Sequence, residues 1–343
     1  MGGGVPCQVL IELMAGGHSP NRRGILNYMD LFLGLDGGGS RTQAYLGDGR
    51  NHILARAEAG PSNPLKVGIE EAKRELLRAA RAALRGVAVP HARQTGVSAQ
   101  KHRPGQSVLA GVCAGVAGVS RQAIGRPLLA WLREAIPARH HLLVTDAEIA
   151  LFAAVGTGAG MIVVAGTGSI AFARDCRGRT LRAGGWGASF DDLGSGYDLG
   201  RKAIMAALEE YDGRSGRTLL TRRICRALKL SEITQVVLKD LTPQQVAALS
   251  PLVSEAARDG DRVARRLCAE AAHDLARLAL ALARRVGRGA GPVVCAGGVL
   301  SSPAIRRSFA RHVHRCAPSL PVRLLRREPA EGALDMARRL AMQ

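Results

Sequence analysis

The sequence predicts a mixed α/β protein of two related domains, and three observations lead to this expectation. Apolar runs typical of strands alternate with amphipathic stretches typical of helices. An apolar strand, a glycine-rich turn and a second apolar strand occur at 31–48, and the same plan recurs at 161–179, roughly 125 residues further on. A chain of 343 residues is also long enough for two separate hydrophobic cores.

The composition excludes several classes of protein. The chain is 47% hydrophobic and 22% charged, as in ordinary globular proteins, and it has no apolar run of about 18 residues that could cross a membrane. Its seven cysteines are scattered without a C-x-x-C pair, which argues against a zinc or iron–sulfur site and fits the reduced thiols of the cytoplasm. The net charge of +20 comes from arginines spread over many segments, and only 3% of the residues are aromatic, so the sequence does not favour a nucleic-acid partner.

We expect the N-terminal domain at 29–155, after a disordered or mis-annotated extension at 1–28. Its expected elements are, in order, a strand at 31–35, its partner at 43–46, a helix at 69–85, a polar loop at 87–106, a strand within 107–118, a helix at 127–136, and a strand and helix within 140–156. The C-terminal domain, at 156–330, holds the second hairpin and an amphipathic helix at 261–285. A third glycine turn lies between a strand and a helix at 293–305.

The glycine turns have the composition of a phosphate site, because successive backbone N–H groups with no Cβ in the way form concave anion sites. The first turn adds the hydroxyl of Ser40, and the second adds those of Thr167 and Ser169. The first turn lies between two strands, which excludes a dinucleotide fingerprint or a P-loop, since both need a following helix. Either turn alone is typical of a tight hairpin with glycine at positive φ, but the two together favour binding of a polyphosphate.

The chain contains, in this order, the segments LDGGGSRTQAYL, TDAEIA, VVAGTGSIAF, GGWGASFDDLGSGYDLG, AGGVLSSPAI and PAEGALDMA. This ordered set resembles the N-acetylglucosamine kinase family of the BadF/BadG/BcrA/BcrD-type ATPases, within the superfamily of actin, sugar kinases and heat-shock chaperones. The resemblance covers nearly the whole chain. It implies two ribonuclease-H-like domains with a cleft between them, and a C-terminal helix, 331–343, that returns to the N-terminal domain. It also implies ATP and Mg²⁺ as cofactors, a sugar as substrate, and the homodimer common in such families.

The resemblance implies roles for residues of the nucleotide site. By similarity Asp36 holds Mg²⁺ through water, Ser40 and Thr167 contact the phosphates, and the third turn lies against the adenosine. The residues expected to bind ATP are Gly37, Gly38, Gly39, Ser40, Gly166, Thr167, Gly168, Gly297 and Gly298.

Asp146 is the candidate catalytic base, because phosphoryl transfer needs one group that orients or deprotonates the attacking hydroxyl. It follows a strand and begins a helix, so an alternative role is that of a helix N-cap. The family's catalytic aspartate falls in the same T-D-A motif, and the resemblance therefore implies that Asp146 is the base and contacts the sugar.

The other sugar contacts implied by the resemblance are Asn63, Gly185, Trp186 and Asp192. Asn63 is alternatively a turn residue before a proline. The family usually has G-D-E-G-S where this chain has D-D-L-G-S, so Leu193 stands in place of a glutamate. An apolar side chain cannot replace a carboxylate that binds a hydroxyl, which leaves the identity of the sugar open.

The expected activity is ATP-dependent phosphorylation of the 6-hydroxyl of N-acetylglucosamine. Kinases for glucosamine or N-acetylmuramic acid remain alternatives, as does a BadF-type ATPase that acts on a protein partner. An activator ATPase of the benzoyl-CoA reductase type would need cluster-binding cysteines, and a sugar-responsive repressor would need a helix-turn-helix and usually a zinc motif. The sequence has neither pattern.

Overall fold

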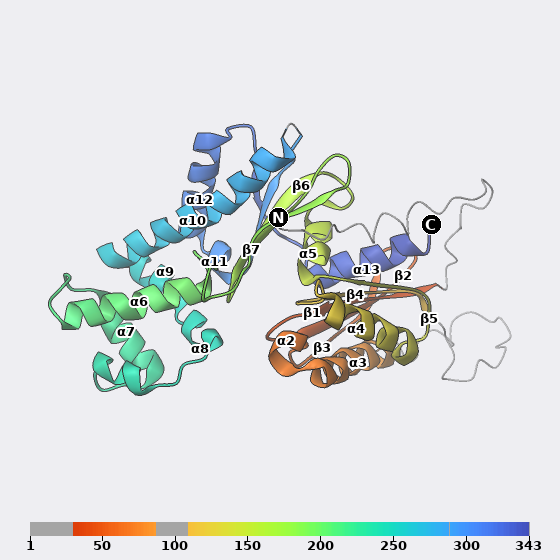
Figure 1. Cartoon of the computed structure of the whole chain (residues 1–343), viewed down its shortest axis with the longest axis horizontal. Coiled ribbons are helices and arrows are strands. Elements are labelled where there is room, and N and C mark those ends of the chain that lie inside the picture. The colour runs from red at the N-terminus through yellow and green to blue at the C-terminus, as the bar shows by residue number, and fades with distance from the viewer. Residues whose placement is uncertain (1–29, 87–108, 288, 343) are drawn as a thin grey trace, which may run out of the picture. The chain divides into compact units, whose positions relative to one another are not determined.

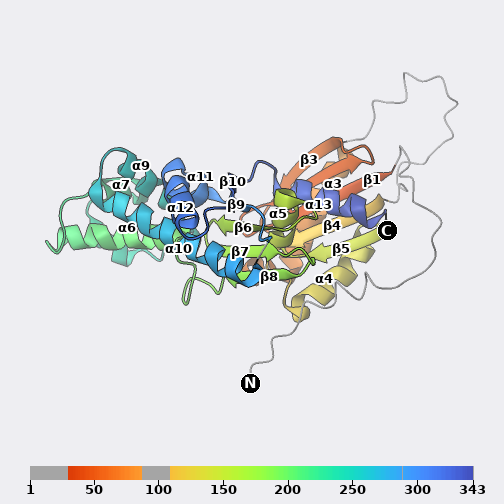
Figure 2. The same cartoon turned by 90° about the horizontal axis from the view of Figure 1, so that it is seen from above.

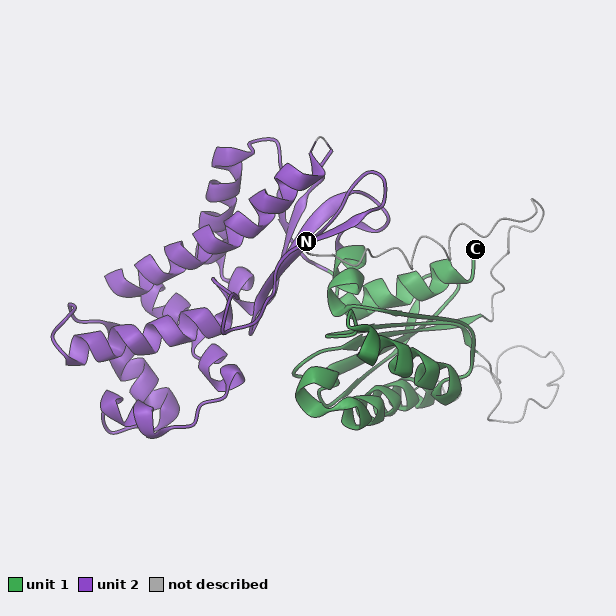
Figure 3. Ribbon diagram, viewed as in Figure 1, with its two compact units in different colours: residues 1–153, 327–343 green, residues 154–326 purple. Residues whose placement is uncertain are grey.

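The computed structural model of the chain describes residues 30–86, 109–287 and 289–342, so the interpretations of 1–28 and 87–106 lie outside the described residues. The chain divides into two units (Figure 3). Unit 1 runs up to Ala153 and resumes at Arg327, and unit 2 is the continuous stretch between them. The sequence placed these two divisions at 155/156 and 330/331.

Each unit is built on a five-stranded sheet, and the two sheets have the same topology. The strand order is β3-β2-β1-β4-β5 in unit 1 and β8-β7-β6-β9-β10 in unit 2. In both, the first three strands form an antiparallel meander, and the fourth and fifth run parallel to the first. The repeated topology confirms the prediction of two related, ribonuclease-H-like α/β domains.

The elements of unit 1 are β1 (Leu31–Gly37), β2 (Thr42–Asp48), β3 (Ile53–Ala59), α2 (Pro64–Val67), α3 (Ile69–Arg85), β4 (Leu109–Val116), α4 (Gln122–Ala135), β5 (Ala138–Val144), α5 (Asp146–Val155) and α13 (Pro329–Leu340). Those of unit 2 are β6 (Gly160–Ala165), β7 (Ser169–Arg174), β8 (Thr180–Gly184), α6 (Gly196–Tyr211), α7 (Leu219–Leu228), η2 (Ile233–Leu238), α8 (Pro243–Ala247), α9 (Ser250–Arg258), α10 (Arg262–Val286), β9 (Val293–Ala296), α11 (Gly298–Ser301), α12 (Pro303–Cys316) and β10 (Val322–Leu324). None of the helices among the described residues is long and apolar enough to cross a membrane.

The sheet of unit 1 is covered on both faces. Leu33 and Leu35 of β1 pack in one core with α3 and α4, whereas Phe32 packs in a second core with α5 and α13. Figure 1 shows these two pairs of helices on opposite faces of the sheet. Because both faces are buried, β1 and β4 are almost continuously apolar instead of alternating with polar residues.

Helix α13 packs directly on the backbone of the sheet, and glycines in the strands make room for it. A Cβ on Gly34 of β1 would lie 2.3 Å from the Leu334 nitrogen, and a Cβ on Gly111 of β4 would lie 2.6 Å from the Ala337 carbonyl oxygen. Neither contact could be accommodated without moving the helix. The strand that carries Asp36 is therefore fixed by a helix from the far end of the described chain.

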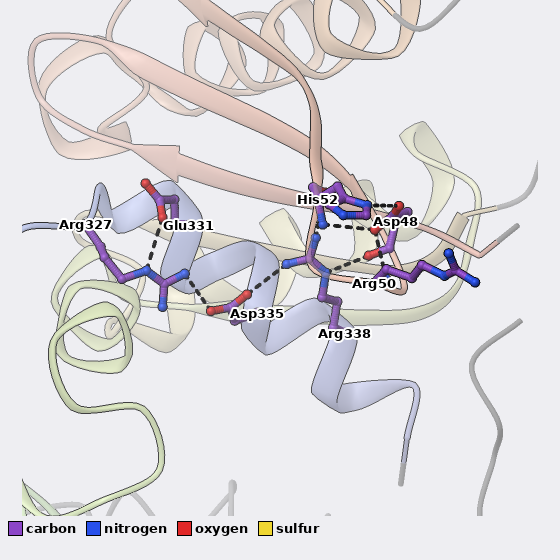
Figure 4. Close-up of polar contacts among 7 residues, drawn as sticks. All are labelled: Asp48, Arg50, His52, Arg327, Glu331, Asp335 and Arg338. Atoms are coloured by element: carbon purple, nitrogen blue, oxygen red, sulfur yellow. Dashed lines mark hydrogen bonds and ion pairs between the residues drawn. The ribbon is translucent and has the colours of Figure 1, made fainter. Parts of the chain in front are cut away.

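Arg338 binds α13 to the turn between β2 and β3 (Figure 4). Arg338 is only 5% exposed, and its Nε and Nη2 donate to the carbonyl oxygens of Asp48 and His52 at 2.8 and 2.9 Å. Its Nη1 donates to Asp335 at 2.9 Å, and Asp335 also accepts from Arg327 at 2.7 Å. A buried arginine is tolerated here because backbone oxygens and a carboxylate bind its guanidinium.

In unit 2 the long helix α10 lies against β6, β7 and β8 and also contacts α9 and α12 (Figure 2). Its buried face is made largely of alanines, which allows close packing against these neighbours. The same core contains Phe309 of α12, which is fully buried. This single core extends from the sheet through the helices of the unit.

Candidate functional site

The carboxyl edge of the unit 1 sheet brings two of the predicted residues together. Strands β1, β4 and β5 are parallel, so the end of β1 with Asp36 and the end of β5 before Asp146 lie at one edge. Burial, and next the nearby charge of Asp146, raise the pKa of Asp36 to about 7, and Glu328 adds to this rise. Burial also raises the pKa of Asp146. The fold therefore brings the carboxyl groups of Asp36, Asp146 and Glu328 close enough for their negative charges to repel one another.

These acids have the chemistry of a site for a hard cation. The described residues contain no group of three or more His, Cys, Asp or Glu side chains able to enclose a metal ion by themselves. Mg²⁺ commonly binds one or two carboxylates and completes its shell with water and substrate phosphates. Asp36 fits that manner of binding, because a cation would relieve the opposition between its charge and that of Asp146.

The helix cap beside Asp146 is supplied by another residue. The Oγ1 of Thr145 accepts from the Glu148 N–H at 3.2 Å, and the Glu148 carboxylate accepts from the Thr145 N–H at 2.8 Å, which is a capping box. Asp146 is the first residue of α5, and its Oδ1 accepts from the Ala147 N–H at 3.0 Å. The alternative role of Asp146 as the N-cap is therefore wrong.

The first glycine turn, 37–40, is supported by the segment that follows β3. The turn is a tight hairpin, since Gly37 pairs with Thr42 and the Gly38 N–H donates to the Arg41 carbonyl at 3.0 Å, but none of its three glycines has the positive φ expected for that interpretation. Instead neighbouring groups lie close: a Cβ would lie 2.7 Å from the Ser62 Oγ at Gly37 and 2.9 Å from the Lys66 Nζ at Gly39. The Gly38 carbonyl accepts from the Ser62 N–H at 3.0 Å. Ser40 is exposed on this turn, and the ammonium group of Lys66, which the sequence did not single out, lies over it.

Asn63 lies on the same supporting segment. Its Oδ1 accepts from the Leu65 N–H at 3.0 Å and so caps the short helix α2. The local role expected as the alternative is thus present, and the contact of Asn63 with a sugar stays a prediction. The segment is held by Thr42, whose hydroxyl is 2.7 Å from both the Gly60 carbonyl and the Ser62 Oγ.

The second glycine turn, 166–169, is supported by the start of α6 and by the loop that precedes it. The N–H groups of Gly196 and Tyr197 donate to the Gly166 and Thr167 carbonyls at 2.7 and 3.1 Å. The carboxylate of Asp192 accepts from the Ser169 N–H at 3.1 Å. Asp192 has a φ of 62°, a strained value for a non-glycine residue. Asp192 therefore orders the turn, and its predicted sugar contact is untested.

The third turn lies beside the second within unit 2. Gly297 has a φ of 87°, and a Cβ there would lie 2.3 Å from the Ala165 carbonyl oxygen at the end of β6. At Gly298 and Gly166, by contrast, a Cβ would meet no atom within 4 Å. The two turns therefore present glycine backbone to open space, as a ligand that approaches the backbone closely requires.

The loop between β8 and α6, which carries the predicted sugar contacts Gly185, Trp186 and Asp192, exposes its aromatic residues. Trp186 is 70% exposed and Phe190 is 92% exposed. Gly185 has a φ of 74°, and Leu193 is partly exposed while its carbonyl accepts from the Ser169 Oγ at 2.9 Å. The isobutyl side chain of Leu193 therefore cannot make the hydrogen bonds that the carboxylate of the expected glutamate would make.

A sequence model of the BadF/BadG/BcrA/BcrD ATPase family matches residues 33–334. An N-acetylmuramic acid/N-acetylglucosamine kinase of Clostridium acetobutylicum is 31% identical over 319 residues, which cover 90% of this chain and 99% of that protein. An N-acetyl-D-glucosamine kinase of Dictyostelium discoideum is 27% identical over 265 residues, which cover 75% of this chain and 81% of that protein. A solved structure from Chromobacterium violaceum, assigned as an N-acetylglucosamine kinase, is 28% identical with a TM-score of 0.73, covering 92% of this chain and 100% of that one.

Proposed function

This chain belongs to the BadF/BadG/BcrA/BcrD ATPase family, and from that membership we propose that it is an ATP-dependent amino-sugar kinase acting on the 6-hydroxyl of N-acetylglucosamine. The observation that carries the phosphotransferase chemistry is the carboxylate of Asp146, which lies at the sheet edge beside Asp36 while Thr145 caps the helix. The near full-length similarity to sugar kinases carries the amino-sugar class.

Asp146 is the general base of the proposed reaction. It accepts the proton of the sugar hydroxyl as that oxygen attacks the γ-phosphorus of ATP. A base works best when its pKa is near the working pH, and burial raises the pKa of Asp146 in that direction. Asp36 holds Mg²⁺ through water; when bound, the ion supplies charge neutralisation for the phosphates.

The glycine turns bind the nucleotide in this proposal. The backbone of Gly37–Gly39 and Gly166–Gly168, together with the hydroxyls of Ser40 and Thr167, contacts the phosphates. Gly297 and Gly298 lie against the adenosine. Lys66, whose ammonium lies over the first turn, adds a positive charge for the same phosphates.

The sugar is bound by Asn63, Gly185, Trp186 and Asp192 together with the base. N-Acetylmuramic acid and glucosamine are the alternative substrates, because Leu193 removes a carboxylate that would help to distinguish sugars. A cytoplasmic location and a homodimer belong to the same proposal.

The test is ADP release by the purified protein with ATP and Mg²⁺, across N-acetylglucosamine, N-acetylmuramic acid, glucosamine and glucose. We expect strong stimulation by an N-acetylated hexosamine, with phosphate on the 6-oxygen of the product by ³¹P NMR. Stimulation by glucosamine alone would change the substrate and keep the kinase. ADP release that no sugar stimulates would favour an ATPase that acts on a protein partner.

A further inference from the structure

The exposed indole of Trp186 is flanked by glycines that have positive φ values. Gly184, Gly185 and Gly187 around it have φ values of 73°, 74° and 100°. Glycines in the left-handed region keep much conformational freedom unless other contacts hold them. An exposed side chain on such a segment has a defined orientation only if something fixes both the backbone and the ring.

Arg182, in the middle of β8, contacts both the backbone and the ring. Its Nε donates to the Gly184 carbonyl at 3.0 Å, and its Nη2 donates to the Gly185 carbonyl at 2.6 Å. The guanidinium also lies over the ring of Trp186, with Cζ 4.5 Å from the ring centroid. One planar group therefore binds the two peptide units before the tryptophan and stacks on its indole.

The loop after Trp186 is also held by hydrogen bonds, which involve Asp191. The Trp186 N–H donates to the Asp191 carboxylate at 3.3 Å, and the Asp191 N–H donates to the Gly187 carbonyl at 2.8 Å. The backbone of Arg182 is held in turn, because its carbonyl accepts from Arg285 of α10 at 2.7 Å. The arginine is thus anchored to a long, well-packed helix and transmits that rigidity to the loop.

We infer that Arg182 is a positioning residue that holds the Trp186 indole as a platform for the sugar ring. The guanidinium covers one face of the indole, and the other face is left for the C–H face of a pyranose. This inference rests on the proposed function and deepens it, because it names what orients the sugar contact. Arg182 acts through Trp186 and takes no part in proton or phosphoryl transfer.

The test uses Arg182→Met and Arg182→Lys. The lysine keeps the positive charge but loses the planar fork that binds both glycine carbonyls. We expect either change to raise the KM for the sugar about tenfold, since a platform that must be ordered on binding lowers affinity. The kcat and the KM for ATP should stay within about twofold of wild type, because the side chain of Arg182 contacts Gly184, Gly185 and Trp186, whereas Asp192 and the start of α6 support the second phosphate turn.

A double-mutant cycle separates positioning from a general structural effect. In a Trp186→Ala background, Arg182→Met should raise the KM for the sugar no further, since the residue through which it acts is gone. An equal increase in both backgrounds would overturn the inference. Arg179→Met is the matched control: Arg179 precedes the same strand and pairs with Asp175 at 2.7 Å, so the KM for the sugar should stay at the wild-type value.

Fluorescence tests the same contact without catalysis. The chain has two tryptophans, so in a Trp131→Phe background the emission reports Trp186 alone. We expect Arg182→Met to lower its steady-state anisotropy and to increase quenching by acrylamide, with the thermal midpoint of unfolding retained. Unchanged anisotropy and quenching would refute the inference that Arg182 orders the indole ring of Trp186. If no sugar stimulates ADP release in any variant, the proposed function fails while this measurement still decides the role of Arg182.

Discussion

At the residue scale, Asp36 has a pKa that links the candidate site to stability. Burial and the charge of Asp146 raise its pKa from 3.8 to about 7. The folded state therefore holds a proton that the unfolded state releases at lower pH, so this carboxyl favours folding at low pH and loses that contribution as the pH rises through about 7. We expect the ligand-free, Mg²⁺-free protein to lose stability relative to Asp36→Asn between about pH 4 and about pH 7.

The measurement is the free energy of unfolding in urea for both proteins over that pH range. The Asp36→Asn variant is the reference, because it keeps all titrating groups of the wild type apart from the carboxyl of Asp36. Two curves that stay parallel across the range would contradict the raised pKa.

Asp146 is the second residue whose environment leads to a prediction. Because Thr145 caps α5, Asp146→Asn should leave the helix intact. We expect it to lower kcat about 10²- to 10⁴-fold, the usual contribution of a general base, with an unchanged far-UV spectrum. The same change at exposed Asp240 is the control and should keep full activity. Near-normal turnover of the Asp146 variant would remove it from the proposed chemistry.

At the scale of elements, the contact of α13 with β1 is the most sensitive to a single methyl group. Gly34→Ala would place a Cβ 2.3 Å from the Leu334 nitrogen, so α13 must move off the strand. We expect a loss of about 1–3 kcal/mol or more in the free energy of unfolding, measured by urea denaturation. Gly216→Ala is the control, since a Cβ there meets no atom within 4 Å and the φ is not positive. Equal stability of the two variants would mean that α13 packs more loosely.

Periodicity predicted some elements well and local signals misled others. Helix α3 runs from Ile69 to Arg85 as predicted, because its small apolar residues repeat at helical spacing. Helix α4 begins earlier than predicted, at Gln122, since Pro127 resembled a first helical residue but lies inside the helix. Strand β10 has only three residues and little buried surface, so the sequence has no apolar run there from which a strand could be predicted.

Residues of the candidate site could be predicted where the proposed chemistry requires a particular residue type. Residues whose role depends on which loop or helix they contact in the folded chain could not be predicted. The glycine turns could be located from composition and order along the chain, whereas Asp146 was singled out through the family resemblance. Thr145 was missed as the cap because threonine and aspartate cap helices almost equally well, and one residue of register decides between them. Arg182 and Lys66 were missed because nothing in the sequence separates them from the other 46 of its 48 basic residues until the loops that they contact are placed.

At the scale of the whole molecule, the two units differ in how the chain builds them. Unit 2 is continuous from Ala154 to Arg326 and has its own core, whereas unit 1 needs α13 to cover the face of its sheet that holds Phe32 and Cys113. We expect the fragment 154–326 to fold alone, with a cooperative urea transition by circular dichroism. A chain that stops at 326 should keep that transition and lose the one for unit 1. A fragment 154–326 without cooperative unfolding would show that unit 2 depends on unit 1.

The divided course of unit 1 has a consequence during protein synthesis. The ribosome makes β1 to β5 first, then the whole of unit 2, and only afterwards α13. At about 5–20 residues per second, the stretch from Ala154 to Arg326 delays α13 by roughly nine to thirty-five seconds. Throughout that time the nascent sheet displays Phe32 and its apolar neighbours without their helix. The interval in which a new chain is most prone to aggregate, and most in need of a chaperone, is therefore set by its topology.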